Sequence, residues 1–92
     1  MTDARYELIV APSARRQLSE TLPGAVAVAA FEFIVGPLLD NPQRVGKRLR
    51  PRLDDRHSAR RGTYRVIYRI DEAHHTVTVV AVVYRADAYR SG

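Results

Sequence analysis

Residues 64–70 constrain the fold of this chain more than any other part of the sequence. In an extended strand, side chains alternate between two faces, and here the alternation separates two kinds of residue. One face holds Tyr64, Val66, Tyr68 and Ile70, and the other holds Arg65 and Arg69. We therefore expect a strand that covers a core with one face and presents cations on the other. Because a guanidinium group binds phosphate oxygens through a planar fork, the second face is suited to phosphate.

Two further strands are predicted beside this one. Residues 57–61 precede it across a short turn at Gly62-Thr63, and residues 76–84 follow it across residues 71–75. Connections this short predict antiparallel hairpins. Residues 77–83 are apolar on both faces, which predicts that this last strand lies at the centre of the sheet.

The N-terminal half predicts one strand and two helices. Residues 6–10 form a short strand, and a first helix begins at Pro12 and ends before Pro23-Gly24. A second helix covers about residues 25–39, with its end kinked or frayed at Gly36-Pro37. The order is βααβββ, an α+β fold in which two helices pack on one face of a small, mostly antiparallel sheet. With 92 residues, the chain has room for a single domain, residues 1–92.

The second helix is apolar on more than one side. Val28, Phe31 and Ile34 lie where a surface helix would carry charged side chains. Two explanations fit: the helix is enclosed by the rest of the domain, or part of it is covered by a partner protein.

The charge of the chain comes almost entirely from arginine. Fifteen Lys and Arg stand against ten Asp and Glu, which gives a net charge of +5, and Lys47 is the only lysine. Arginine is favoured where phosphate or carboxylate is bound through two parallel hydrogen bonds, although a GC-rich coding sequence also favours it. Several of the cations lie in a connector at residues 40–56, whose charges we expect to be solvated.

Several classes of protein are disfavoured. Cysteine is absent, so the chain has neither disulfides nor thiolate metal sites. The first residues lack the apolar core of a signal peptide, and the apolar run at residues 25–35 carries Glu32 and falls short of the ~20 residues needed to span a bilayer. We expect a cytoplasmic protein that binds no membrane, metal or cofactor.

Histidine and serine offer little catalytic chemistry. His74 and His75 lie side by side in a predicted turn, where adjacent side chains point apart, and we expect an exposed polar turn. His57 opens the basic strand and is a minor candidate for the cleft. The serines have no nucleophile-elbow context, and no glycine-rich phosphate loop is present.

The C-terminal residues 84–90 read as a strand that breaks into a short helical turn. Such a turn would carry Tyr89 back toward Arg85. Nearby positive charge lowers the pKa of a tyrosine by favouring the phenolate. The alternative is a tyrosine that only packs at the edge of the domain.

Five short motifs occur in a fixed order along the chain. They lie at residues 14–18, 41–42, 46–49, 58–68 and 85–89, and the most specific is Gly62-Thr63-Tyr64-Arg65 followed by an apolar strand. Together they resemble the RelE-type toxins of the RelE/ParE toxin–antitoxin superfamily over nearly the whole chain. The resemblance implies a small toxin that a cognate RelB-like antitoxin neutralises, and that cleaves mRNA in the ribosomal A site without a metal.

The resemblance also implies a set of functional residues. The catalytic candidates are Arg65, Arg85, Tyr89 and Arg60, and the RNA-binding candidates are Lys47, Arg48, Arg50, Arg61 and His57. In such a site the 2′-hydroxyl of the RNA is the nucleophile, and arginines stabilise the charged transition state. Since arginine cannot act as a base at neutral pH, proton transfer is left to Tyr89 or, with a lowered pKa, Lys47.

One position departs from the ribonuclease pattern. Ser58 stands where well-studied members have a further lysine, and either Lys47 or Arg61 is a candidate to compensate. The departure leaves room for a ParE-like inhibitor of DNA gyrase. A third alternative, from another class of protein, is a basic module that binds RNA through charge alone without cleaving it.

Overall fold

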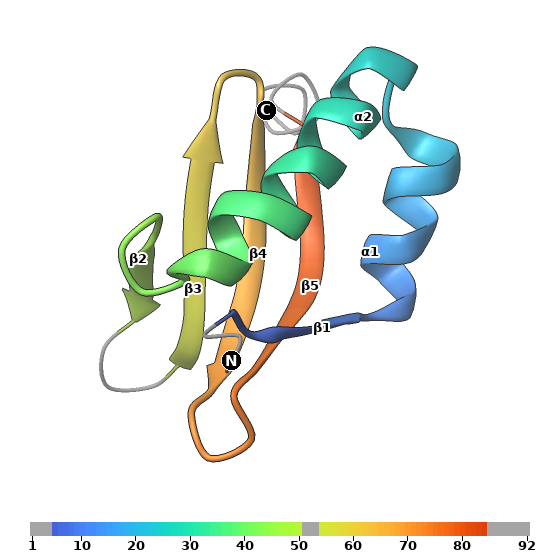
Figure 1. Cartoon of the computed structure of the whole chain (residues 1–92). Helices are drawn as coiled ribbons and strands as arrows, with labels where there is room; N and C mark the ends of the chain where they lie inside the picture. Colours follow the sequence, from blue (N-terminus) through green and yellow to red (C-terminus); the bar gives the residue numbers. More distant parts are fainter. Residues whose placement is uncertain (1–4, 51–53, 85–92) are drawn as a thin grey trace.

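The computed structural model describes residues 5–50 and 54–84, and these form a sheet with helices on one of its faces (Figure 1). Two helical segments, η1 and η2, are π-helical. The elements in chain order are β1 (Glu7–Val10), α1 (Pro12–Arg16), η1 (Gln17–Thr21), α2 (Gly24–Phe33), η2 (Ile34–Leu38), β2 (Lys47–Arg50), β3 (Asp54–Arg61), β4 (Tyr64–Asp71) and β5 (Thr76–Tyr84).

The sheet has five strands in the order β1-β5-β4-β3-β2. β1 runs parallel to β5, and the other three pairs are antiparallel, which confirms the α+β arrangement. The prediction that the strand at residues 76–84 is central was wrong, because β4 is the middle strand and β5 lies between β1 and β4. Apolar residues on both faces indicate an interior strand, but they do not distinguish one interior position from another.

A fifth strand was not predicted. β2 lies within the basic segment that the sequence suggested was a solvated connector, and it pairs antiparallel with β3 at the edge of the sheet. β3 itself begins at Asp54, three residues before the predicted start at His57. Edge strands are often charged, which protects their unpaired backbone from other chains. A strand of this kind has no apolar alternation for a sequence pattern to detect.

The helices follow the predicted ranges closely. α1 and η1 continue from Pro12 to Thr21, and α2 and η2 continue from Gly24 to Leu38. We expected the helix to kink or fray at Gly36-Pro37. Instead the helix continues through Pro37 as the π-helical segment η2, which is wider than an α-helix. Proline lacks an N–H group and its ring collides with the preceding turn, and a π-helical turn is one way to accommodate such strain.

The core lies between the helices and the sheet. Its largest fully buried side chains are Tyr68, Ile34, Leu38, Val66, Val77, Val79 and Val82. Ile34, which we had grouped with the outward side of the second helix, therefore belongs to the core. The other two residues of that group are exposed, Val28 by 59% and Phe31 by 52%. The domain thus encloses only part of the helix.

Side chains from the first helix cover the end of β5. β1 pairs with β5 only as far as Val79, and a bulge follows at Val80. The Ser13 hydroxyl donates to the Val80 carbonyl at 2.7 Å, and the Gln17 side-chain oxygen accepts from the Val82 N–H at 2.6 Å. These contacts fix the helices on the sheet. Within residues 5–50 and 54–84, no helix combines the length and the apolar content needed to cross a membrane.

Candidate functional site

Arginines line the sheet face that points away from the helices. Arg60 on β3 and Arg65 on β4 are directly opposite each other, and both are exposed. Their neighbours Ala59 and Val66 form the next pair and are fully buried on the helix face. Directly opposed residues have Cβ atoms ~5 Å apart, and like charges at this distance repel each other. The pair is therefore a favourable place for an anion.

A cleft of ≈470 Å³ lies beside this pair. Its lining comes from β2 and the residues before it, together with β3 and β4: Val45, Gly46, Lys47, Arg48, Leu49, Ser58, Arg60 and Arg65. Lys47 on β2 stands directly opposite Ser58 on β3. An ammonium group is thus available on the rung where Ser58 replaces the expected basic residue.

The backbone at the start of β2 passes very close to the sheet. A Cβ atom added to Gly46 would lie 2.4 Å from the Tyr68 hydroxyl and 2.8 Å from the Ser58 carbonyl oxygen. The Tyr68 hydroxyl donates to the Pro42 carbonyl at 2.5 Å, and burial raises the pKa of Tyr68 to about 12. Tyr68 therefore stays protonated and anchors the segment that leads into β2.

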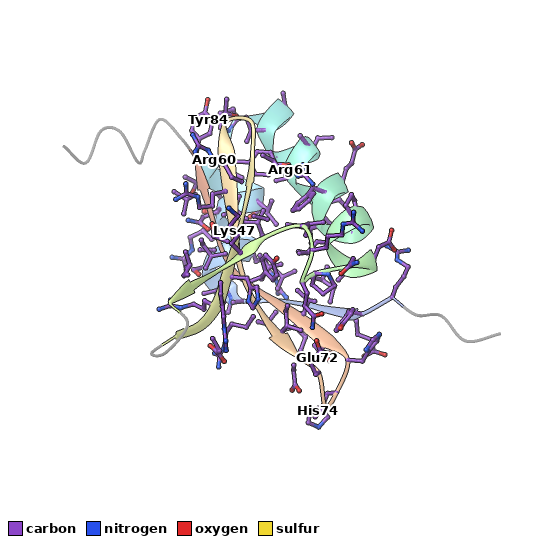
Figure 2. All side chains as sticks on the ribbon, turned by 90° about the vertical axis from the view of Figure 1, so that its left-hand side faces the viewer. Lys47, Arg60, Arg61, Glu72, His74 and Tyr84 are labelled. Carbon is purple, nitrogen blue, oxygen red and sulfur yellow. The ribbon has the colours of Figure 1, made fainter. Side chains whose placement is uncertain are left out.

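Two of the predicted RNA-binding residues lie on the opposite face of the sheet. The guanidinium carbon of Arg61 sits 4.7 Å from the centre of the Phe33 ring, in α2. The His57 ring stacks on Tyr68 at 5.5 Å, and its Nδ1 atom is buried. Figure 2, which views the sheet from its edge, shows Arg61 on the α2 side and Arg60 on the other side. The prediction that His57 reaches the cleft was wrong, and Arg61 is not the residue that compensates for Ser58.

The remaining candidates divide into two groups. Arg48 lines the cleft. In the strand register, Arg50 of β2 is the partner of Asp54 of β3, and a register shift separates Arg50 from Arg48. Arg85 and Tyr89 lie outside the described residues. The described part of the site therefore consists of the cations of β2, β3 and β4.

A second arginine pair lies on the same face. Arg56 and Arg69 are directly opposite each other, and with Asp55 and Val80 they line a hollow of ≈270 Å³. Sequence reasoning recognised that Arg69 shares the face of Arg65, but missed Arg56 because the strand was predicted to begin one residue later. The alternation would have revealed it once the strand was extended.

The helix side carries an apolar groove of ≈930 Å³ between β1, the first helix and α2. Ile9, Val28 and Phe31 line it and are all more than half exposed. Arg15 and Glu32 also line the groove.

The hairpin between β4 and β5 is an exposed polar turn, as predicted. Asp71 accepts a hydrogen bond from the His74 backbone N–H at 3.2 Å, and its carboxylate lies 2.8 Å from the His74 Nδ1 atom. Figure 2 shows His74 and Glu72 at the tip of the hairpin, at the far end of the sheet from Arg60. These histidines take no part in the cleft.

Known proteins resemble this chain over most of its length. Residues 8–89 match a family model described as the ParE toxin of the type II toxin–antitoxin system parDE. Toxin RelE of Mycobacterium tuberculosis is 47% identical over 88 residues, which cover 96% of this chain and 90% of that protein. Toxin RelG of the same organism is 48% identical over 85 residues, 92% of this chain and 97% of the relative.

Solved structures agree with these relatives. The toxin–antitoxin complex RelBE2 of M. tuberculosis contains a chain with a TM-score of 0.82 and 46% identity, covering 88% of this chain and 99% of that one. The intact RelBE complex of E. coli matches with a TM-score of 0.72 at 21% identity, covering 86% of this chain and 95% of that chain, which supports the fold. The family match, the close relatives and the shared fold agree: this chain belongs to the RelE/ParE family of toxins from type II toxin–antitoxin systems.

Proposed function

We propose that this toxin is a ribosome-dependent endoribonuclease that cleaves mRNA and so inhibits translation in the cytoplasm. The observation that carries the proposal is the cleft in which Lys47, Arg60 and Arg65 meet. Three cations from three adjacent strands, on a face that no described helix covers, form a rigid site for a phosphodiester. The resemblance to RelE toxins suggests that the phosphodiester belongs to mRNA.

The chemistry needs no nucleophile from the protein. The RNA 2′-oxygen would attack the adjacent phosphorus, the bond from phosphorus to the 5′-oxygen would break, and a 2′,3′-cyclic phosphate and a 5′-hydroxyl would result. Arg60 and Arg65 would donate hydrogen bonds to the non-bridging oxygens as negative charge develops there. Removing one preorganised donor of this kind costs roughly 10²–10³ in rate.

Two proton transfers accompany this reaction, one from the 2′-hydroxyl and one to the leaving 5′-oxygen. Arginine cannot accept a proton at neutral pH, so we assign the transfers to Tyr89, with Lys47 as the alternative within the cleft. Arg85 would stabilise the transition state beside Arg65. The described lining of the cleft contains no carboxylate or imidazole that could serve as a base, so the ribosome would have to hold the RNA in line for attack.

The test is cleavage of mRNA in a bacterial translation extract, with the new 5′ ends mapped. The wild-type chain should cut translated mRNA, and Arg65→Ala should lower the rate by at least about 100-fold. Arg16→Gln, which removes an exposed charge from α1, is the matched control. Equal cleavage by Arg65→Ala would refute the catalytic assignment, and efficient cleavage of free RNA would refute the dependence on ribosomes.

Inhibition of DNA gyrase is the second candidate, because the matched family model is that of a ParE toxin. A supercoiling assay with purified gyrase distinguishes the two. Inhibition of supercoiling with no new mRNA 5′ ends would replace the first proposal with this one. RNA binding without cleavage, weakened only slightly by any single substitution, would instead indicate a non-catalytic basic module.

We further propose that a cognate RelB-like antitoxin binds this toxin. The similar structures from M. tuberculosis and E. coli are complexes of toxin with antitoxin. The apolar groove along α2 offers the exposed Val28 and Phe31 side chains to such a partner, and helical peptides commonly bind grooves of this kind. Co-expression with a RelB-like protein from the same genome, followed by copurification, tests the interaction.

A further inference from the structure

We infer that Arg56 and Arg69 form a second phosphodiester site, so that the RNA strand runs along β3 and β4 instead of touching only the cleft. The inference rests on the proposed function, in that it takes the ligand of the cleft to be RNA. The inference goes beyond the proposed function in two ways: it adds a second site that binds the RNA backbone, and it gives the direction in which the RNA crosses the sheet.

The geometry of the sheet repeats itself at this second place. Arg56 and Arg69 are directly opposed on β3 and β4, just as Arg60 and Arg65 are. The two pairs are separated by four residues on each strand, ~13 Å along the sheet. Because the separation is an even number of residues, both pairs point to the face away from the helices. A single RNA strand lying along β3 and β4 would meet both.

On β3 and β4, the position between the two arginine pairs carries no charge, and Lys47 of β2 lies beside it on the same face. Ser58 and Ile67 form the rung between them, and both are half-buried. A ribose or base can rest on such a floor while the flanking arginines hold phosphates. Two arginine pairs ~13 Å apart, with Lys47 at the edge of the sheet between them, fit an extended polyanion better than they fit one small anion.

Asp55 places a carboxylate, which is a planar anion, against Arg69 of the second pair. Its carboxylate oxygen lies 3.3 Å from the Arg69 guanidinium, beside the ≈270 Å³ hollow that both residues line with Arg56. Both side chains of this ion pair are more than half exposed, so water screens the interaction and it is weak. A phosphate of the RNA can therefore displace the carboxylate. Asp55 would act as an internal competitor for the site.

The test measures binding of fluorescent 2′-O-methyl RNA by anisotropy over a series of KCl concentrations. This RNA lacks the attacking hydroxyl and stays intact. We compare a decanucleotide with a dinucleotide, which has one phosphodiester. The binding constant K falls as salt rises, and we compare the magnitude of the slope of log K against log salt. Each lost phosphate contact lowers this magnitude by about 0.7 for a single strand. Arg69→Gln should lower the slope by this amount for the decanucleotide and leave the dinucleotide unchanged. Asp55→Asn should tighten binding of the decanucleotide.

One control variant and two patterns of results separate this inference from the proposed function. Arg16→Gln removes the same charge elsewhere and should leave both slopes unchanged, and an equal loss there would overturn the inference. If Arg65→Gln lowers the slope while Arg69→Gln and Asp55→Asn have no effect, RNA binds in the cleft alone and the inference is wrong. If Arg69→Gln lowers the slope and Arg65→Gln does not, the second site stands and RNA binding in the cleft is refuted.

Discussion

At the scale of single residues, the positive charge of the cleft depends on which neighbour supplies the cation that Ser58 lacks. Lys47 stands directly opposite Ser58, and directly opposed side chains are ~5 Å apart at Cβ. An ammonium group from either residue can therefore occupy nearly the same volume of the cleft. The sequence could only list Lys47 and Arg61 as candidates, because the choice depends on β2 pairing with β3.

This geometry predicts a rescue. Lys47→Gln should lower the single-turnover rate of mRNA cleavage on ribosomes by roughly 10²-fold, the effect expected for one electrostatic contact in the transition state. Adding Ser58→Lys to Lys47→Gln should recover most of the loss, since the new ammonium group arises from the opposite strand on the same rung. Failure of the double variant to exceed Lys47→Gln, while it remains folded, would show that Lys47 acts through something other than its charge at this position.

Arg61 is expected to behave as a structural residue. Its guanidinium lies over the Phe33 ring, and an exposed cation–π contact contributes ~0.5–1 kcal/mol. Arg61→Gln should lower the free energy of unfolding in urea by about this amount. The cleavage rate should stay that of wild type, in contrast to Arg60→Gln at the adjacent position. A large loss of cleavage in Arg61→Gln would contradict the placement on the helix face.

At the scale of elements, β2 is held by a contact that only glycine permits. The Cβ of alanine at position 46 would lie 2.4 Å from the Tyr68 hydroxyl and 2.8 Å from the Ser58 carbonyl oxygen. Overpacking of this kind costs ~1–3 kcal/mol, so Gly46→Ala should lower the free energy of unfolding by that amount. It should also weaken cleavage, because β2 carries Lys47 into the cleft.

A double-mutant cycle that combines Gly46→Ala with Tyr68→Phe tests whether the clash with the Tyr68 hydroxyl causes the loss of stability. Phenylalanine removes the nearer of the two clashing oxygens but leaves the Ser58 carbonyl in place. The double variant should therefore be more stable than the sum of the two single changes predicts. Strict additivity would mean that the clash with Ser58, and not the one with Tyr68, sets the cost.

The β4–β5 hairpin has a stability that depends on pH. Hydrogen bonds from the His74 side chain and backbone hold the pKa of Asp71 below its ordinary value of 3.8. A carboxyl whose pKa is depressed by folding stabilises the native state above the unfolded pKa, and this contribution is lost as pH falls through the folded pKa. Between pH 6 and pH 3, wild type should lose more unfolding free energy in urea than Asp71→Asn does. Equal losses would show that the hairpin carboxylate contributes nothing.

The elements differ in how far the sequence could predict them. The hairpins around β4 were predicted because alternation and short turns act locally, and Gly62 has the positive φ of 56° that a tight turn needs. β2 could not be predicted, because it has no apolar pattern of its own. Its position depends on the hydrogen bond from Tyr68 to the Pro42 carbonyl, between residues far apart in the sequence. The misplacement of His57 and Arg61 is different in kind: strict alternation from Arg60 would have put both on the helix face.

At the scale of the whole molecule, the sheet separates two surfaces of different chemistry. The face away from the helices presents the arginine pairs of β3 and β4, and the helix side presents the apolar groove along α2. An RNA strand and an apolar partner helix therefore need not compete for the same atoms. Neutralisation by a partner in the groove would require that partner to extend around the sheet edge to the cleft, or to block docking on the ribosome.

This separation predicts that antitoxin binding and RNA cleavage can be uncoupled. Phe31 is 52% exposed in the groove, so Phe31→Glu should fold normally while it places a charge in an apolar contact. Central aromatic contacts at interfaces contribute 2 kcal/mol or more, and we expect affinity for the cognate antitoxin to fall by roughly 30-fold or more by calorimetry. Ala29→Glu, exposed on the same helix but outside the groove, is the matched control.

Cleavage by the Phe31→Glu toxin decides how neutralisation works. Without antitoxin it should equal that of wild type, because the groove and the cleft lie on opposite sides of the sheet. With antitoxin present at a concentration that silences wild type, the variant should continue to cleave. Full neutralisation of Phe31→Glu, together with weakened antitoxin binding by Arg65→Gln, would instead mean that the acidic partner covers the arginine pairs directly and that the exposed face of α2 serves another contact.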